Sequence, residues 1–407
     1  MTTFILGGAQ SDFARNLGRE GREIGDLVGD LVDGALADAA IDPAEVGAIH
    51  VGNAFGELFN GQGHLGAMPA TVRPALWGVP AARHEAACAS GSIAVLAAMA
   101  ELEAGRCDVA LVIGVEQQRN VPGDQAARLL GAAAWVGHEG EGARYLWPHM
   151  FSRLGDAYAE RWGLDRRHLV AISRKNLGNA RRNGRAQTRG WTIGDATFAE
   201  SEATNPVIEG RLRRADCAQI TDGGAAIVLA SARYTDAWAR ARDRTPARTA
   251  QLLGWGHRTA GLPLEAKLAR ADRDGLLLPH VAQAFADATR RAGTTLDGLD
   301  GVEVHDCFTT TEYMAIDHLG LTPPGQSWRA IEDGRTALGG ALPVNPSGGL
   351  IGGGHPVGAT GVRMVLDATL QVTGRAGDYQ VGNARTFATL NLGGSATTVV
   401  SFVVGAR

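Results

Sequence analysis

The sequence predicts an α/β fold built from two similar halves. Each half contains, in the same order, an amphipathic helix, a strand, a distinctive residue before an apolar helix, and a second strand. At 407 residues the chain also exceeds the size at which a single hydrophobic core usually stops growing. We therefore expect two α/β halves related by an approximate twofold axis. Chance similarity between α/β segments is the alternative explanation of the repeat.

The first half begins with apolar residues at helical spacing over 26–40, which predicts a helix. A strand is expected over 46–51. Cys88 then precedes an apolar helix at 93–104, and an apolar strand follows at 109–114. This order is the unit that the second half repeats.

The second half is predicted to place a helix at 277–292 and a strand at 301–305. His355 then precedes a helix at 362–372, and a strand is expected over 385–392. His355 thus occupies the place that Cys88 has in the first half. Ligands bind open α/β domains outside the carboxyl ends of the strands. Two such domains packed face to face would bring both residues to one cleft.

Three parts of the chain are predicted: an N-terminal half of residues 1–118 and 216–248, an inserted loop domain of residues 119–215, and a C-terminal half of residues 249–407. The insertion contains nine basic residues and one acid between 161 and 190. Basic residues can bind the phosphates of a nucleotide. The alternative is a solvated helix surface. The candidates for phosphate contacts are Lys175, Arg181 and Arg182.

Composition excludes several classes of protein. A net charge of −4 does not favour nucleic acid as a partner. Four scattered cysteines without a CxxC pair argue against a disulfide framework or a metal site, and we interpret Cys107 and Cys217 as structural. The start of the sequence lacks the features of a signal peptide, and no apolar run is long enough to span a membrane. We expect a soluble, cytoplasmic protein with no membrane partner.

Cys88 is the candidate nucleophile. Its neighbours Ala86, Ala87, Ala89 and Gly91 are small, so a bulky thioester can approach the sulfur. A helix N-terminus is expected to lower the pKa of the thiol, and its free N–H groups can bind an oxyanion. A buried structural cysteine is the alternative reading of this residue taken alone.

His355 is the candidate base. Three glycines precede it and a Pro follows it, which predicts a tight turn that presents one imidazole at a helix start. Histidine has a pKa suited to accepting a thiol proton near neutral pH. A histidine satisfied in a hydrophobic core would not need such surroundings.

His305 and Cys307 follow the predicted strand at 301–305. Strand ends that face the cleft are catalytic positions in α/β folds. Cys307 can give and take a substrate proton, and His305 can donate a hydrogen bond to a thioester oxygen. With Cys88 and His355 they complete a set of nucleophile, acid and base.

Together these residues resemble the thiolase family, and within it the sterol carrier protein type. The segment 87–91 around Cys88 is similar to the family's nucleophile segment. His305-Asp306-Cys307-Phe308 is similar to the motif that distinguishes the sterol carrier type. The segments 345–350 and 354–361 are similar to the signature that carries the catalytic histidine.

The resemblance implies the duplicated five-layer α-β-α-β-α thiolase fold with an inserted loop domain. It also implies a homodimer or homotetramer, and coenzyme A or acyl-CoA as a co-substrate without a permanently bound cofactor. By analogy with the family, Cys88 is acylated, His355 activates it, and Cys307 is the second acid and base. His305 and His355 would line one oxyanion hole.

The second oxyanion hole implied by the resemblance consists of the Cys88 amide and a glycine at Gly393 or Gly394. Asn391 and Gly354 are expected to contact the substrate. Two departures from the family's pattern concern the segment 389–394. It lacks the Cys-x-Gly motif of ordinary thiolases, so Cys307 must serve instead, and Leu390 stands where the sterol carrier type usually has a histidine.

The expected function is therefore acyl transfer in lipid metabolism, such as fatty acid or steroid degradation. The enzyme would cleave 3-ketoacyl-CoA with CoA, or condense two acyl-CoAs, as an acetyl-CoA acyltransferase. One alternative is another carbon–carbon enzyme of the same fold, either a retro-aldolase or an acyltransferase that needs a small OB-fold partner. A second alternative is a non-catalytic carrier of acyl-CoA or lipid. The insertion contributes Trp135, Trp147, Phe151 and Trp162, which could line an acyl tunnel or pack the domain.

Overall fold

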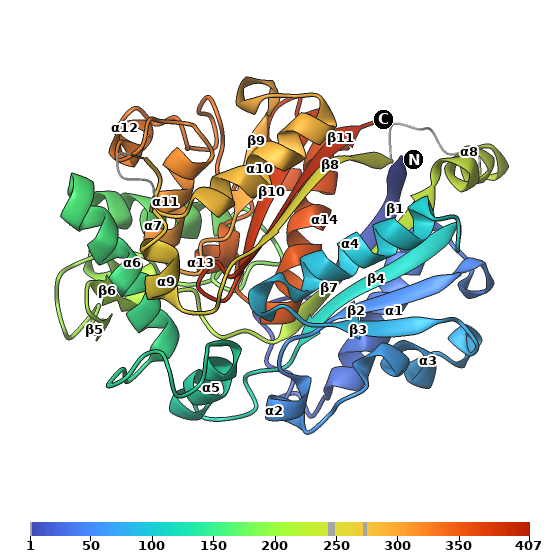
Figure 1. The fold of residues 1–407 in the computed structure, drawn as a ribbon. Helices are drawn as coiled ribbons and strands as arrows, with labels where there is room; N and C mark the ends of the chain where they lie inside the picture. The colour runs from blue at the N-terminus through green and yellow to red at the C-terminus, as the bar shows by residue number, and fades with distance from the viewer. Residues whose placement is uncertain (1, 243–248, 272–274) are drawn as a thin grey trace.

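A single mixed sheet of nine strands forms the centre of the protein (Figure 1). The computed structural model describes residues 2–242, 249–271 and 275–407. Across the sheet the strand order is β3-β2-β4-β7-β1-β8-β11-β10-β9. The strands are β1 (Thr3–Gln10), β2 (Ala48–Gly52), β3 (Ala81–His84), β4 (Val109–Glu116), β7 (Gly223–Ser231), β8 (Ala250–Thr259), β9 (Gly301–Val304), β10 (Thr386–Gly393) and β11 (Thr398–Ala406).

The strand pairings repeat about the middle of the sheet. In each half a parallel pair, β2 with β4 or β9 with β10, lies next to an antiparallel pair, β4 with β7 or β10 with β11. The next pairs toward the middle, β1 with β7 and β8 with β11, are also antiparallel, and β1 pairs with β8 at the centre. Strand β3 beside β2 has a short counterpart in the parallel bridge between Val302 and Val344. The predicted duplication is confirmed.

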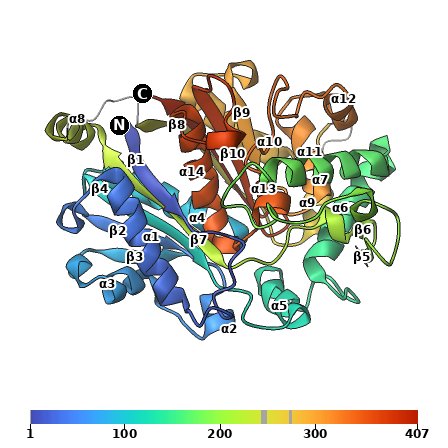
Figure 2. The same cartoon turned by 180° about the vertical axis from the view of Figure 1, so that it is seen from behind.

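Helices cover both faces of each half of the sheet (Figure 2). The helices of the first half and the insertion are α1 (Ile24–Ala39), α2 (Gly56–Asn60), α3 (Met68–Val72), α4 (Ser90–Glu103), α5 (Gly123–Leu130), α6 (Leu146–Trp162), α7 (Arg166–Ala180) and α8 (Ala232–Ala241). Those of the second half are α9 (Leu264–Leu268), α10 (Pro279–Ala292), α11 (Thr309–His318), α12 (Ser327–Glu332), α13 (Gly349–Gly353) and α14 (Thr360–Val372).

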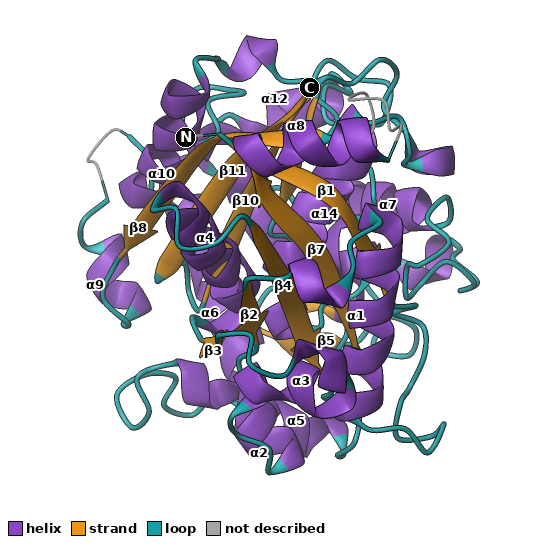
Figure 3. Ribbon diagram, turned by 90° about the vertical axis from the view of Figure 1, so that its right-hand side faces the viewer, coloured by secondary structure: helices purple, strands orange, loops and turns teal. Residues whose placement is uncertain are grey.

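Helices lie on both sides of the strands (Figure 3), and side chains that alternate along each strand divide the core into layers. On β4, Leu111 and Ile113 pack with α1, whereas Ala110 and Val112 face the cluster that contains α4 and α14. On the other half of the sheet, inward residues of β11 join that same central cluster, and the outward residues pack with α10 and α11. Because side chains alternate across a strand, each half of the sheet is buried on both faces. The order of layers is α1, sheet, α4 with α14, sheet, α10 with α11.

The two central helices cross at glycines. A Cβ on Gly91 of α4 would lie 2.7 Å from the Gly358 carbonyl oxygen, and one on Gly361 of α14 would lie 2.3 Å from the Ser92 nitrogen. The two halves therefore meet through backbone at this crossing, directly behind the Cys88 turn.

The insertion of residues 119–215 does not have a core that is separate from the rest. Met150 and Phe151 of α6 and Leu169 of α7 belong to the same apolar cluster as β9, β10 and α10. Helices α6 and α7 thus pack onto the second half of the molecule, whereas Ala126 of α5 packs with Phe55 and Phe59 of the first half. The proposed division at residues 118, 215 and 248 stays a prediction, and residue 248 itself lies outside the described residues. No helix in the described part of the chain combines the length and apolar character needed to cross a bilayer.

Candidate active site

A cavity of about 390 Å³ opens where the insertion meets both halves of the sheet. Cys88, Cys307 and His355 all line this cavity. Their side chains come from the ends of different elements: the turn before α4, the segment after β9, and the turn before α14. The cleft predicted between the halves is thus present, and most of its remaining wall is apolar.

Cys88 lies in a single 3-10 turn (Ala87–Ala89) that runs directly into α4. Ala87 has a positive φ of 50°, which costs a non-glycine residue about 1–3 kcal/mol. The Ser90 hydroxyl offsets this cost from within the turn, because it accepts from the Ala86 N–H at 2.9 Å and donates to the Ala87 carbonyl at 2.6 Å. The result is a sharp turn that directs the sulfur into the cavity.

The Cys88 thiol is not activated in the way that the helix start predicts. Burial away from bulk water raises its pKa to about 12, although the sulfur is accessible from the cavity. The N–H groups of Gly394 and of Cys88 itself oppose this rise, while the carboxylates of Glu116 and Glu85 add to it. The expectation of a lowered pKa was therefore wrong, because burial outweighs the helix terminus. The resting residue is a neutral thiol that needs a base during attack.

His355 is held as a neutral base by its surroundings. Its backbone N–H donates to the Thr221 hydroxyl at 3.0 Å, and its Nδ1 lies 2.7 Å from the Thr360 hydroxyl. The Thr360 hydroxyl also donates to the Pro356 carbonyl at 3.2 Å, which uses its single hydrogen. We therefore assign the ring proton of His355 to Nδ1, which donates a hydrogen bond to Thr360. Its Nε2 is then a free acceptor. Burial, with a smaller effect of the Arg363 guanidinium, lowers the pKa of His355 to about 3.

His305 has the opposite tautomer. The Ser92 hydroxyl donates to Asn391 Oδ1 at 2.8 Å, so the Asn391 Nδ2 group faces His305 Nδ1 at 3.1 Å and donates to it. A neutral imidazole that accepts at Nδ1 carries its proton on Nε2. That Nε2 atom is buried and has no hydrogen-bond partner in the described structure. Burial and the neighbouring His355 keep the pKa of His305 well below its usual value, so the ring stays neutral.

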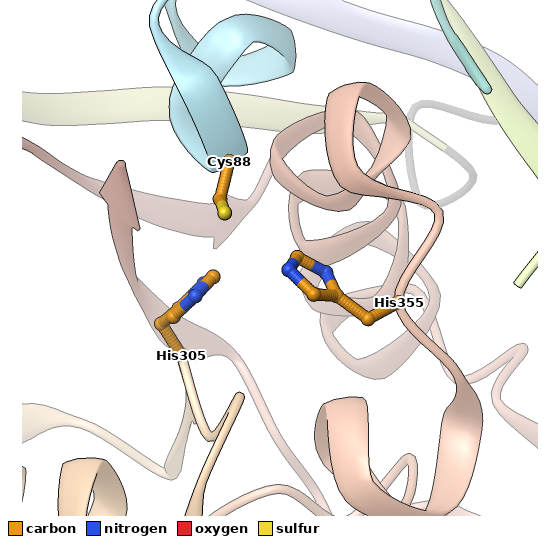
Figure 4. A group of neighbouring side chains, drawn as sticks. All are labelled: Cys88, His305 and His355. Carbon is orange, nitrogen blue, oxygen red and sulfur yellow. The ribbon is translucent and has the colours of Figure 1, made fainter. Parts of the chain in front are cut away.

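Cys88, His305 and His355 point toward one another (Figure 4). The Cys88 sulfur and one ring nitrogen of each histidine lie within 4.8 Å of one another, and the rings meet edge to face at 5.2 Å. One sulfur and two imidazoles form a donor set of the kind that zinc prefers. The tautomers do not fit a metal, however, because the His305 Nε2 proton occupies the lone pair that a metal would need. The arrangement fits a thiol, a base and a hydrogen-bond donor.

Cys307 lies on the same cavity wall. Its pKa is raised well above the usual value by burial and by the neighbouring Cys88 sulfur, while Thr311, whose hydroxyl is 3.6 Å from Cys307 Sγ, opposes the rise. Cys307 is thus a neutral thiol that can give a proton. The four predicted catalytic residues, Cys88, His305, Cys307 and His355, are thus brought together.

The predicted glycines differ in what they supply. The Gly394 N–H is directed at the Cys88 sulfur, so it can serve with the Cys88 amide as an oxyanion hole. Gly393 instead allows β10 to lie close to the segment before Cys88, because a Cβ on this residue would lie 2.2 Å from the Ala86 carbonyl oxygen. The Gly354 N–H donates to Leu350, so it is not free for a substrate. Asn391 is fully buried behind His305 and acts through it.

The repeat is offset from its expected position. Cys88 is the middle residue of the 3-10 turn before α4, whereas the middle residue of the matching turn before α14 is Gly358. His355 lies three residues earlier, where its backbone forms a short parallel bridge with Ile220. The expected equivalence of Cys88 and His355 was wrong by one turn. The His355 imidazole therefore approaches the Cys88 sulfur from a residue that precedes the turn Val357–Ala359, which is the counterpart of the turn Ala87–Ala89.

Lys175 is placed differently from expectation. Its ammonium pairs with Glu312 at 2.8 Å and donates to the Val344 carbonyl at 2.6 Å, within a buried network. It is therefore engaged in the interior, and not available for a phosphate. Arg181 and Arg182 are exposed at the end of α7 and do not line the cavity in the described part of the chain. Their contact with CoA stays a prediction.

Asp306 joins the segment of His305 and Cys307 to the segment before His355. Its carboxylate accepts from the N–H groups of Leu350 and Ile351 in α13, and from Asn176 at 2.7 Å. It thereby ties the segment of His305 and Cys307 to the helix that leads into His355.

Two of the four aromatic residues that could line an acyl tunnel do line the cavity. Trp147 and Phe151 are part of its wall, and Trp135 and Trp162 are not.

Sequence reasoning missed Glu116 and the position of Cys217. Glu116 is fully buried, accepts from the backbone N–H groups of Ala54 and Phe55, and has a pKa raised by burial to about 7. The sequence did contain a signal for Glu116, since this acidic residue directly follows the apolar run of β4. Cys217, which we interpreted as structural, lines the cavity and pairs by backbone with Phe308.

Comparisons with known proteins agree with this geometry. The thiolase N-terminal domain family matches residues 3–190, and the thiolase C-terminal domain-like family matches residues 266–406. The chain belongs to the thiolase family. It is 32% identical over 380 residues to an acetyl-CoA acetyltransferase of Methanothermobacter thermautotrophicus, covering 92% of both chains. It is 27% identical to human sterol carrier protein 2, covering 99% of this chain and 72% of that protein.

Solved structures share the fold of this thiolase family acyltransferase. A chain of the Ltp2-ChsH2(DUF35) aldolase superposes with a TM-score of 0.78 at 21% identity, over 100% of this chain and 98% of the other. The acetyl-CoA acetyltransferase of Syntrophomonas wolfei gives a TM-score of 0.71 at 19% identity, with 100% and 99% coverage. The predicted family and fold are confirmed. The sterol carrier protein type remains a proposal.

Proposed function

We propose that this thiolase is an acetyl-CoA acyltransferase that carries its acyl group on Cys88 and exchanges it with coenzyme A. The observation that supports this most directly is the pair of hydrogen bonds at the two Nδ1 atoms, which assigns opposite tautomers to two imidazoles that face one thiol. His355 offers a bare Nε2 that can take the Cys88 proton, and His305 offers an Nε2–H that can bind an oxyanion. A carrier of lipid has no use for this pairing.

The first half-reaction forms the acyl-enzyme. Cys88 attacks the 3-keto carbon of a 3-ketoacyl-CoA while its proton moves to His355 Nε2, and the new oxyanion accepts from the Gly394 and Cys88 N–H groups. The bond between C2 and C3 then breaks. The leaving acetyl-CoA or propionyl-CoA enolate accepts hydrogen bonds from His305 and the protonated His355, and Cys307 protonates its carbon.

The second half-reaction returns every proton. His355 gives its proton to the Cys307 thiolate and then accepts the proton of the CoA thiol as that sulfur attacks the acyl group. When the tetrahedral intermediate collapses, the Cys88 thiolate leaves and takes the proton back from His355. Run in reverse, the same steps condense two acyl-CoAs.

Substitution of Cys88 tests the proposal. The wild-type protein incubated with acyl-CoA should gain one acyl group at Cys88, detected by mass spectrometry of the intact protein and its peptides. Cys88→Ala should gain none. Cys107→Ala is the matched control, because its half-buried sulfur lies outside the cavity wall, and it should be acylated like the wild type. Acylation of the Cys88→Ala protein at another residue would refute the assignment.

A second candidate is a carbon–carbon enzyme that needs a partner. The observation in its favour is the structural likeness to a chain of the Ltp2-ChsH2(DUF35) aldolase, which is named as an assembly. The presence of Cys88, Cys307 and His355 in one cavity favours thiolysis. Cleavage of 3-ketoacyl-CoA by the purified chain alone, dependent on CoA, would separate the two candidates.

The proposal has further parts, which rest on the family and, for the cytoplasmic location, on the sequence. Acyl-CoA would be the substrate without a permanently bound cofactor, and the protein would act as a homodimer or homotetramer in the cytoplasm, in lipid metabolism such as fatty acid or steroid degradation. Size-exclusion chromatography with light scattering measures the assembly, and a thiolysis screen over short, long and steroid-derived substrates measures the acyl preference.

A further inference from the structure

Glu116 is a fully buried carboxyl group that the steps of the proposed reaction do not use. It is the last residue of β4, and its Oε1 atom accepts from the N–H groups of Ala54 at 2.5 Å and Phe55 at 3.3 Å. Asn53 strengthens the same contact, because its Nδ2 group donates to the Val115 carbonyl of β4 at 2.8 Å. The hydrogen bonds to the carboxylate compensate in part for the water that it loses on burial. They also tie the loop after β2 to the end of β4.

The same carboxylate also contacts the second half of the protein. The Gly358 N–H is directed at it, and a Cβ on Gly358 would lie 2.7 Å from Glu116 Oε1. Gly358 is the middle residue of the turn Val357–Ala359, which lies between His355 and the start of α14. Thr360, whose hydroxyl is 2.7 Å from His355 Nδ1, directly follows that turn. Glu116 therefore joins the loop after β2 to the turn beside the proposed base.

Cys88 packs against the apolar cluster that these two segments form. Phe55 of the loop and Val357 of the turn belong to this cluster, and both line the cavity with Cys88. The backbone is closely packed at this point, because a Cβ on Gly114 of β4 would lie 2.7 Å from the Ala359 Cα atom. Loss of the carboxylate would therefore release N–H groups in both segments that pack with the sulfur.

We propose that Glu116 is a positioning residue for acyl transfer, whose ionised carboxylate holds the loop after β2 and the turn before α14 at the spacing that Cys88 and His355 need. The inference rests on the proposed function. The charge has a second effect, because it disfavours a negative charge on the nearby sulfur and so adds to the raised pKa of Cys88. Burial raises the pKa of Glu116 itself to about 7, while the N–H groups and the Arg83 guanidinium of β3 oppose the rise. The carboxylate is therefore mostly ionised above that pH.

Two variants separate the position of the carboxylate from its charge. Glu116→Asp keeps the charge but shortens the side chain by one carbon, so that the carboxylate cannot reach both segments. We expect kcat for thiolysis to fall about 10-fold with a smaller change in KM, because the reacting groups are displaced while the rest of the cavity still binds substrate. Glu116→Gln keeps the length and an accepting oxygen, and it should retain more of the wild-type kcat than Glu116→Asp.

Glu116→Gln lacks the negative charge and should therefore change the reactivity of Cys88. Alkylation of Cys88 by iodoacetamide at about pH 8, followed by peptide mass spectrometry, should be about 3-fold faster or more, because the thiolate is less disfavoured. A residue that only stabilises the fold would not change this rate in the folded protein.

Asp222→Asn is the matched control for the charge. Asp222 is also a buried carboxylate that accepts from backbone N–H groups, those of Leu17, Gln118 and Arg119. Its substitution should leave the alkylation rate of Cys88 at the wild-type value.

A wild-type kcat in Glu116→Asp, or an unchanged alkylation rate in Glu116→Gln, would overturn the inference. The second result decides alone if Glu116→Asp does not fold. Acylation of wild-type Cys88 by acyl-CoA keeps the two proposals apart. With acylation and unaltered variants only the Glu116 inference fails, and without acylation the proposed function fails as well.

Discussion

At the scale of single residues, the site depends on which nitrogen of each histidine carries the proton. Thr360 and Asn391 make opposite hydrogen bonds to the Nδ1 atoms of His355 and His305, so one Nε2 accepts and the other donates. Arg363 supports this state, because its buried guanidinium lowers the pKa of both imidazoles. In the proposed reaction both rings therefore begin neutral, and the Cys88 proton has one acceptor.

Thr360→Val tests this assignment. The substitution keeps the shape of the side chain and removes the acceptor of the His355 Nδ1 proton, so the tautomer with a bare Nε2 is no longer fixed. We expect kcat/KM for thiolysis to fall on the order of 10- to 100-fold, within the usual contribution of a general base. Thr369→Val is the control, since Thr369 is also buried on α14 and also donates to the carbonyl four residues earlier, at Val365. Equal rates for the two variants would contradict the role of Thr360.

At the scale of elements, the turn between β10 and β11 presents the Gly394 N–H to Cys88. Lys267 holds this turn from α9, because its ammonium donates to Ser395 Oγ at 2.7 Å, to Thr397 Oγ1 at 2.8 Å and to the Leu262 carbonyl at 2.8 Å. The ammonium is buried, and burial lowers its pKa to about 8. A segment far from Cys88 in the sequence thus sets the position of the proposed oxyanion donor.

Lys267→Met should loosen this turn. Loss of hydrogen bonds from a buried charged donor costs about 1–3 kcal/mol of unfolding free energy, measured by urea denaturation. We also expect kcat to fall about 10-fold with little change in KM, because the Gly394 N–H stabilises the transition state more than the bound substrate. The lowered pKa predicts a pH effect as well: the unfolded state holds the proton more tightly between pH 8 and 10.5, so wild-type stability should rise with pH in that range relative to the variant. An unchanged kcat would show that Gly394 needs no support from α9.

The sequence predicted the repeated elements because their apolar periods are strong. Helix 26–40 was found at Ile24–Ala39 and strand 109–114 at Val109–Glu116. Cys88 and His355 could be predicted from a different local signal, because small residues or glycines surround each reactive side chain. The ion pair of Lys175 with Glu312 could not be predicted, because the two residues meet only when distant segments pack. The raised pKa of Cys88 could not be predicted either, because it depends on burial in the folded protein.

At the scale of the whole molecule, the two halves must keep a fixed distance for Cys88 to reach His355. That distance is set where α4 and α14 cross through Gly91 and Gly361. The crossing lies directly behind the catalytic turns, since Ser92 both contacts Gly361 and orients Asn391. Packing between the halves and the protonation of His305 are therefore coupled through one serine.

Gly361→Ala tests this coupling. The added Cβ would lie 2.3 Å from the Ser92 nitrogen, so the helices must separate, and we expect a loss of about 1–3 kcal/mol of unfolding free energy. Gly178→Ala is the matched control, because Gly178 lies in helix α7 with no atom within 4 Å of an added Cβ, and there the substitution should stabilise the protein by about 0.5–1 kcal/mol. Urea denaturation measures both effects, and acylation of Cys88 in the folded variant measures the site. Because a wider crossing displaces Ser92 and with it the Asn391 amide, acyl-enzyme formation should slow in Gly361→Ala even where the protein remains folded. A variant that loses stability but acylates at the wild-type rate would show that the halves can separate without disturbing the histidines.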